Sequence, residues 1–162
     1  MNSKTVALFS TALREVLTES GFRKVVVDEP VSWTASDRTD TIQVSVSVGL
    51  TGDIAGFIVL QGTKDVARRY AELLSLQMGV PIEDTGGFDE MHKAALAEFI
   101  NQIGGRATIR LSEAQIDTDI TPPTIVIGDS VSAVFAAGLA GSDIPVRGPA
   151  GNLFCTVLYR GA

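Results

Sequence analysis

The sequence predicts an α+β sandwich, in which a largely antiparallel sheet of about six strands packs against three main helices. Apolar residues recur at helical spacing in three segments, strand-like segments gather in the middle and at the end of the chain, and hairpin-like turns join most of them. A doubly wound sheet is disfavoured because the glycine segment 49–52 opens a strand and not a helix. The length of 162 residues suits a single domain covering 1–162.

An amphipathic helix and a strand are predicted first. Residues 4–20 carry apolar side chains at helical spacing, and Gly21 follows where a helix C-terminus favours positive φ. A short β-rich piece at 23–27 comes next. Residues 41–48 then alternate polar and apolar side chains without a fault, which predicts a strand with one buried face. That face consists of Ile42, Val44, Val46 and Val48.

A hairpin and a second helix follow. Residues 50–54 supply turn chemistry and residues 57–60 form an apolar run, so we expect this run to pair antiparallel with the preceding strand. Residues 64–78 return to helical spacing. Gly79, with Pro81 beyond it, predicts the end of this helix, because proline disfavours helical geometry in the residue before it.

The third helix is predicted to begin near Asp89 and Glu90 and to run through Ile103 to Gly104-Gly105 or somewhat past them. On a helical wheel, one arc is apolar and is expected to face the core; it holds Met91, Ala95, Leu96, Phe99 and Ile103, with Ile100 at its margin. The other side brings Glu98 and Asn101 together at i and i+3, with Ala94 and Ala97 beside them.

The rest of the chain is β-rich. Strands are predicted at 124–127, 131–139 and 153–159, with glycine and proline clusters between them.

Composition excludes several classes of function. Thirteen Lys and Arg against nineteen Asp and Glu give a net charge of −6 without a concentrated basic face, which disfavours a duplex nucleic-acid partner. No segment approaches the ~20 apolar residues of a spanning helix, so no membrane insertion is expected. The single cysteine, Cys155, excludes an internal disulfide and a cysteine-based metal site, which makes a reduced, cytoplasmic compartment the default.

Two features of the third helix are candidates for chemistry. His92 is the only histidine, so any Ser-His or Cys-His scheme would need it, but its place on the apolar side favours a structural role. The pair of Glu98 and Asn101 has two readings: an ordinary solvated face, or a contact surface where short alanines let another protein approach while the two polar side chains protrude.

Residues 97–107, Ala-Glu-Phe-Ile-Asn-Gln-Ile-Gly-Gly-Arg-Ala, resemble the active helix of the CheC/CheX family of chemotaxis phosphatases, and within it the CheX branch. Two further blocks support the resemblance. Residues 49–60 are similar to the central hairpin of the family, and residues 119–128 are similar to the segment that leads into the late strands. Together the blocks extend over roughly residues 41–128.

The resemblance implies a phosphatase that accelerates hydrolysis of the aspartyl phosphate on a phosphorylated CheY-type response regulator. Asn101 would orient the attacking water, and Glu98 would pair with the active-site lysine of the regulator. The chain would need no cofactor or metal of its own, because the magnesium ion would belong to the partner's active site. The resemblance also implies a homodimer, for which residues 134–139 could supply strand edges.

Two positions depart from the family pattern. Ala94 stands where the family commonly has Asp or Ser, four residues before Glu98. In the first helix, Glu15 is followed three residues on by Thr18 and not by Asn, so the chain offers one site. Two alternatives therefore stay open: a non-catalytic response-regulator-binding or adaptor module of the same fold, and a small-molecule hydrolase that uses His92.

Overall fold

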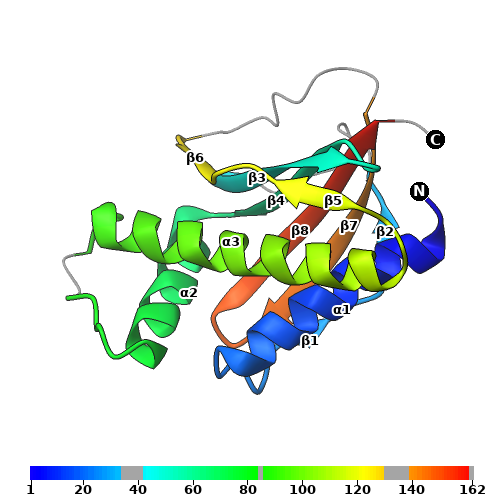
Figure 1. The fold of residues 1–162 in the computed structure, drawn as a ribbon. Coiled ribbons are helices and arrows are strands. Elements are labelled where there is room, and N and C mark those ends of the chain that lie inside the picture. Colours follow the sequence, from blue (N-terminus) through cyan, green and yellow to red (C-terminus); the bar gives the residue numbers. More distant parts are fainter. Residues whose placement is uncertain (34–41, 84–85, 130–138, 161–162) are drawn as a thin grey trace.

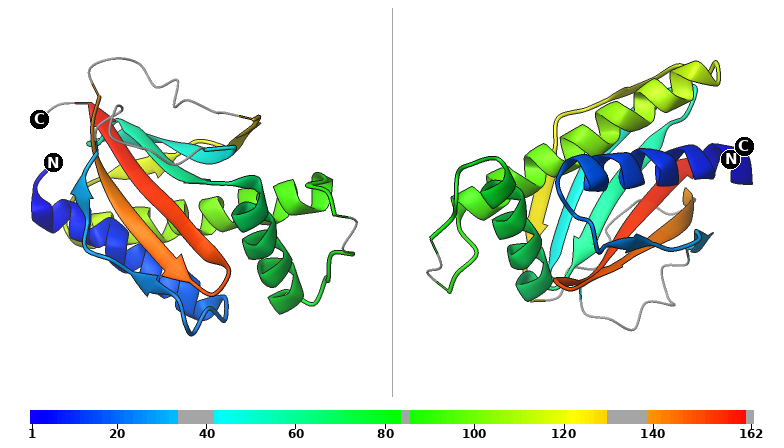
Figure 2. Two further views of the ribbon diagram at one scale, coloured as in Figure 1. Left: turned by 180° about the vertical axis from the view of Figure 1, so that it is seen from behind. Right: turned by 90° about the horizontal axis from the view of Figure 1, so that it is seen from below.

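Three helices cover one face of an eight-stranded sheet in the computed structural model, which describes residues 1–33, 42–83, 86–129 and 139–160 (Figure 1). Seen from below, the helices lie in front of the sheet, with α1 and α3 side by side and α2 near one end of α3 (Figure 2). The predicted α+β class is confirmed. The sheet has eight strands and not about six. Residues 31–32 and 118–120 pair in segments too short to stand out in the sequence, and a strand over residues 139–148 occupies a stretch that we predicted as glycine and proline clusters.

All pairings in the sheet are antiparallel, in the order β1-β7-β8-β4-β3-β5, with β2 also paired to β7 and β6 to β3. The strands are β1 (Val26–Val27), β2 (Val31–Ser32), β3 (Val44–Gly52), β4 (Gly56–Gly62), β5 (Thr118–Ile120), β6 (Thr124–Ile127), β7 (Leu139–Gly148) and β8 (Gly151–Arg160). The predicted hairpin is confirmed as β3 and β4, with Val46 opposite Leu60.

Each helix begins at a side chain that caps its first turn. The helices are α1 (Ser3–Glu19), α2 (Lys64–Gln77) and α3 (Glu90–Glu113). Asn2, Thr63 and Asp89 precede them, and each accepts hydrogen bonds from backbone N–H groups that the helix itself leaves unpaired. Within the described ranges, no helix is long and apolar enough to cross a membrane.

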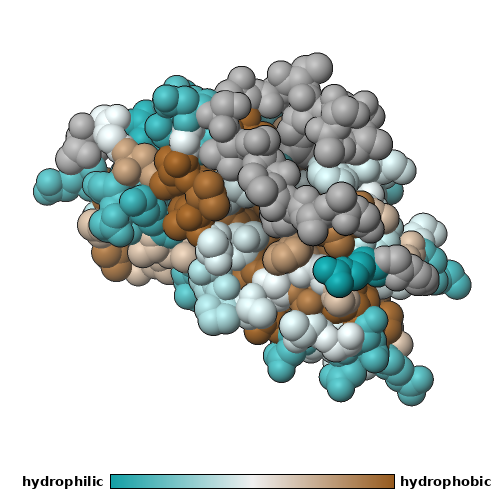
Figure 3. Space-filling view, turned by 90° about the horizontal axis from the view of Figure 1, so that it is seen from above, coloured by the Kyte–Doolittle hydropathy of each residue, from teal (hydrophilic) through white to brown (hydrophobic). Residues whose placement is uncertain are grey.

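The core lies between the sheet and the helices. The predicted inward face of β3 is buried as expected, together with Ile42 just before the strand. From the helix side, Phe99 of α3 and Tyr70 of α2 meet the ring of Phe22, which follows α1, at centroid distances of 6.4 and 5.4 Å. The opposite face of the sheet is seen in Figure 3, where hydrophobic surface lies among hydrophilic side chains.

The structure corrects the predicted end of the third helix. α3 continues through Gly104-Gly105 to Glu113, because Gly104 sits where the helix crosses the sheet: a Cβ there would come within 3.2 Å of Val48 and Ile120 side-chain atoms. This glycine permits close packing and does not end the helix. The helix ends where Gln115 adopts a φ of 63°, a left-handed conformation reached without a glycine signal.

Three smaller expectations also change. The strand β3 runs on through residues 50–52, which we predicted as turn, and the reversal falls at residues 53–55. Met91, predicted in the core, is 44% exposed. The predicted strand 131–139, and with it most of the 134–139 dimer edge, falls outside the described residues except for Leu139, which begins β7.

Candidate functional site

Glu98 and Asn101 both lie exposed on the outer surface of α3, as the helical wheel predicts. Their positions are about 4.5 Å apart along the helix axis, so the two side chains leave the surface as neighbours. Ala94, one turn before Glu98, is exposed, and Ala97 between them is half-buried. The short alanine side chains leave the carboxylate and the carboxamide as the groups that protrude.

The opposite side of α3 fixes this pair in space. Leu96, Phe99, Ile100 and Ile103 are each at most 1% exposed and belong to the main core cluster. Core packing holds this helix in place, so polar side chains that it carries have a more fixed orientation than polar side chains on a loop. The pair is therefore presented by a rigid element.

The two polar side chains differ in their contacts. Glu98 accepts a hydrogen bond from Gln102, with 3.2 Å between Nε2 and Oε1, and no lysine or arginine of the described ranges lies within ion-pair distance of it. The Asn101 carboxamide has no hydrogen-bond partner among the residues described. Sequence reasoning missed Gln102, although its place four residues after Glu98 already puts it on the same side of the helix.

Glu15 of α1 forms ion pairs with two arginines of α3. Arg106 Nη1 approaches Glu15 Oε2 at 2.8 Å, and Arg110 Nε approaches Oε1 at 2.7 Å. The hydrogen bonds from Arg110, and further those from Arg106, lower the pKa of Glu15 to about 2 against a partial desolvation. The Thr18 hydroxyl donates to the backbone carbonyl of Arg14. Glu15 therefore links α1 to α3, while the Thr18 hydroxyl is bonded within α1.

His92 has a structural role. Its ring is fully buried, and its Nδ1 accepts from the backbone N–H of Asp89 at 3.1 Å, which closes a capping box at the start of α3. The ring lies between two carboxylates: Nδ1 is 2.9 Å from Oδ1 of Asp89, and Nε2 is 3.2 Å from Oε1 of Glu72 on α2. A histidine without solvent access cannot reach a substrate, which argues against the His92 hydrolase.

Cys155 is buried on the helix-facing side of β8. Burial, and to a lesser degree the charge of Asp143, raises the pKa of its thiol to about 12, so the thiolate nucleophile does not form near neutral pH. In the part of the chain that the structure describes, no group of three or more His, Cys, Asp or Glu side chains could hold a metal ion.

Comparison with known proteins identifies a family. The family model described as "Chemotaxis phosphatase CheX" matches residues 44–146, which include β3, β4, α2, the whole of α3 and most of β7. A search of curated protein sequences finds no match.

Solved structures share the fold over nearly the whole chain. A chemotaxis protein CheX from Desulfovibrio desulfuricans has a TM-score of 0.78 at 22% identity, covering 97% of this chain and 99% of that one. A CheC-like superfamily protein from a Shewanella species reaches 0.82 at 19% identity, covering 99% and 100%. The CheX-CheY-BeF3-Mg complex from Borrelia burgdorferi gives 0.78 at 23% identity, again covering 99% and 100%. At these identities, the likeness shows the fold.

Proposed function

Because this chain belongs to the CheX family of chemotaxis phosphatases, we propose that it binds a CheY-type response regulator and accelerates hydrolysis of its aspartyl phosphate. The observation that carries the proposal is the pair of Glu98 and Asn101, which protrudes from a rigidly packed helix with neither side chain paired to a charged group in the described ranges. The Borrelia relative, solved as a CheX-CheY complex with BeF3 and Mg, supports a regulator of that type as partner.

In this proposal, Asn101 supplies the catalytic contact. An aspartyl phosphate is a reactive acyl phosphate, so holding a water molecule in line with the phosphorus can supply much of the rate increase. A carboxamide both donates and accepts hydrogen bonds and does not titrate near neutral pH, so it can hold that water in one orientation. The exposed Asn101 side chain has no competing hydrogen bond in the described structure.

Glu98 supplies affinity and orientation. Its carboxylate would pair with the active-site lysine of the regulator, one turn of helix away from the water that Asn101 holds. The pairing needs no rearrangement of an existing ion pair, since Glu98 contacts the neutral Gln102 amide and no cation of the described ranges. The magnesium ion of the reaction is expected in the regulator's active site, where it would neutralise charge on the phosphoryl group.

The direct test is a time course of phosphate loss from a phosphorylated CheY-type regulator of the same genome. We expect Asn101→Ala to lower kcat by roughly 100-fold, because the positioned water is lost. The matched control is Ser112→Ala, an exposed substitution farther along the same helix, which should leave the rate unchanged. Equal rates for the wild type and Asn101→Ala, or no acceleration by the wild type, would refute the phosphatase.

The alternative function is a regulator-binding or adaptor module without catalysis. It is favoured by Ala94, which is exposed one turn before Glu98 where the family commonly has Asp or Ser. An adaptor would bind the activated regulator without shortening the lifetime of its phosphate. Titration of the regulator, combined with the same time course, separates the two functions.

We also propose a cytoplasmic homodimer. The family resemblance implies this assembly, and hydrophobic surface is visible on the sheet face of Figure 3. Sedimentation equilibrium over a hundred-fold range of concentration tests it. A mass that stays at the 17.1 kDa of one chain throughout would contradict the dimer.

A further inference from the structure

A groove runs beside Glu98, where the ends of α1 and α2 meet the middle of α3. It has a volume of about 530 Å³. Its floor is apolar and includes Val16, Leu74 and Phe99, one from each helix and each at most 6% exposed. Its rim holds exposed side chains of all three helices: Glu19, Gln77, Met78, Glu98 and Gln102.

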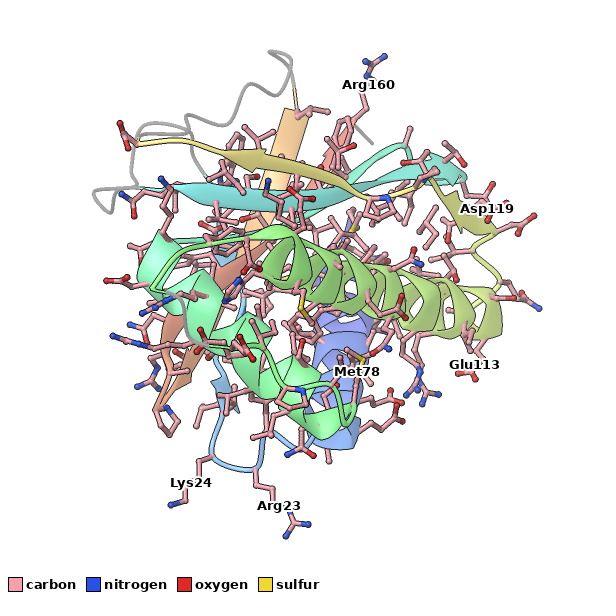
Figure 4. All side chains as sticks on the ribbon, turned by 90° about the vertical axis from the view of Figure 1, so that its left-hand side faces the viewer. Arg23, Lys24, Met78, Glu113, Asp119 and Arg160 are labelled. Carbon is pink, nitrogen blue, oxygen red and sulfur yellow. The ribbon has the colours of Figure 1, made fainter. Side chains whose placement is uncertain are left out.

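Met78 is the exposed apolar part of this rim. It follows the last residue of α2 and is 52% exposed, next to Gly79 with a φ of 77°, where the chain turns away from the helix. Figure 4 shows Met78 at the end of α2, near α3 and α1. A flexible thioether side chain at the rim of an apolar hollow is well suited to contact another protein, because it adapts to the shape of the partner.

Of the two carboxylates on the rim of the groove, only Glu98 has no cation beside it in the described ranges. Glu19 of the rim is bound to Arg106, with 2.7 Å between Oε2 and Nη2, and Arg106 is held on its other side by Glu15. Glu98 has only the Gln102 amide within hydrogen-bond reach among the described residues. An occupant of the groove that brings a cation to Glu98 therefore completes an ion pair without breaking one.

We propose that this groove is a second contact with the regulator, and that it takes a segment in which a large apolar side chain neighbours a lysine or arginine. The apolar side chain would pack on Met78 and the floor, and the cation beside it would be the lysine that pairs with Glu98 in the proposed function. This inference rests on the proposed function, because it names the regulator as occupant. It adds the ends of α1 and α2 to a contact that the exposed pair on α3 begins.

Two physical arguments favour this occupant. Lysine and arginine combine an apolar stem with a charged head, which matches an apolar floor beside a carboxylate. The groove also adjoins the proposed site, because Glu98 and Gln102 line it. Asn101 does not line the groove. Glu98 thus joins two surfaces: the water-positioning contact of Asn101 and the groove.

The test compares two variants at the end of α2 by steady-state kinetics with the phosphorylated regulator. Met78→Glu places a carboxylate on the rim, removes the apolar contact and should raise KM roughly ten-fold with kcat nearly unchanged. The matched control is Leu76→Glu, on the same helix and 58% exposed, which lines a different hollow. Leu76→Glu should leave KM within about two-fold of the wild type.

Binding to the regulator activated with beryllofluoride and Mg²⁺, followed by titration calorimetry, separates this inference from the proposed function. If the wild type binds without hydrolysis, the phosphatase fails, and a weaker affinity of Met78→Glu alone still supports the groove. Equal affinities for Met78→Glu, Leu76→Glu and the wild type would overturn the groove while the phosphatase stands. A Met78→Glu chain that changes from dimer to monomer at unchanged regulator affinity would also overturn it, because the occupant would then be a second copy.

Discussion

At the scale of single residues, substitutions of Glu98 and Asn101 should change different kinetic parameters. Glu98→Gln keeps the length of the side chain and removes its charge, so the ion pair with the regulator is lost while the water held by Asn101 remains. We expect KM to rise about five- to ten-fold with little change in kcat, and the dependence of KM on salt to weaken. Kinetics at two ionic strengths measure both. A loss confined to kcat would contradict the assigned role.

His92 should matter for stability and not for chemistry. His92→Ala removes the side chain that closes the capping box and the link to Glu72, and it leaves a buried space, so the free energy of unfolding should fall by about 1–3 kcal/mol. His92→Gln retains a side chain that can cap from the same position and should lose less. Urea unfolding gives both values, and the phosphatase rate per folded molecule should stay constant. A lower rate per folded molecule would instead support a catalytic role for His92.

The candidate pair was predictable because it depends on helical spacing alone. Residues three apart on a helix share a side, so Glu98 and Asn101 could be placed together without knowledge of the rest of the fold. The groove beside them could not be predicted in this way. Val16, Leu74 and Phe99 come from three segments far apart in the sequence, and only the packing of the helices brings them together.

At the scale of elements, the two adjacent glycines of α3 make a matched pair. A Cβ on Gly105 would meet nothing within 4 Å, so Gly105→Ala should stabilise the chain by about 0.5–1 kcal/mol through helix propensity. A Cβ on Gly104 would press on Ile120 and Val48 at 3.2 Å, and this crowding offsets the same gain. Thermal unfolding should therefore rank Gly105→Ala above Gly104→Ala. The reverse order would contradict the close crossing of α3 over the sheet.

The same glycines explain where prediction of the elements failed. Helices and the β3–β4 hairpin follow from local periodicity, and apart from the end of α3 their predicted positions are confirmed within a few residues. Gly104-Gly105 looks like a helix end in sequence because glycine is a poor helix former, but tertiary packing of Gly104 against β3 and β5 overrides that preference. The short strand β5 carries almost no local signal and exists through its pairing with β3.

At the scale of the whole molecule, ionised carboxylates hold separate parts of the fold together. Glu15 links α1 to α3, and Asp28 accepts two hydrogen bonds from Arg147, which links the segment after β1 to β7. The hydrogen bonds from Arg147 are the main cause that lowers the pKa of Asp28, as those from Arg110 do for Glu15. The Glu15 link therefore joins two helices, and the Asp28 link joins the segment after β1 to the sheet at β7.

These lowered pKa values predict acid sensitivity with a definite sign. A carboxylate with a lower pKa in the folded than in the unfolded chain stabilises the fold above its unfolded pKa, and loses that contribution as the pH falls through the folded value. For Glu15, this window extends from its ordinary value of 4.5 down to about 2. The wild type should therefore lose stability progressively below about pH 5, as the linked carboxylates take up protons.

Glu15→Gln tests this window, because it removes the titrating group while keeping the shape of the side chain. The variant should be less stable than the wild type at pH 7, and the difference should shrink as the pH falls from about 4.5 towards 2, as Glu15 of the wild type itself takes up protons. Urea midpoints measured at intervals between pH 7 and pH 2.5 follow the two curves. Glu29→Gln, at an exposed carboxylate without an ion pair in the described ranges, is the matched control and should run parallel to the wild type. A Glu15→Gln curve that also ran parallel to the wild type would mean that the paired arginines do not stabilise this fold through the charge of Glu15.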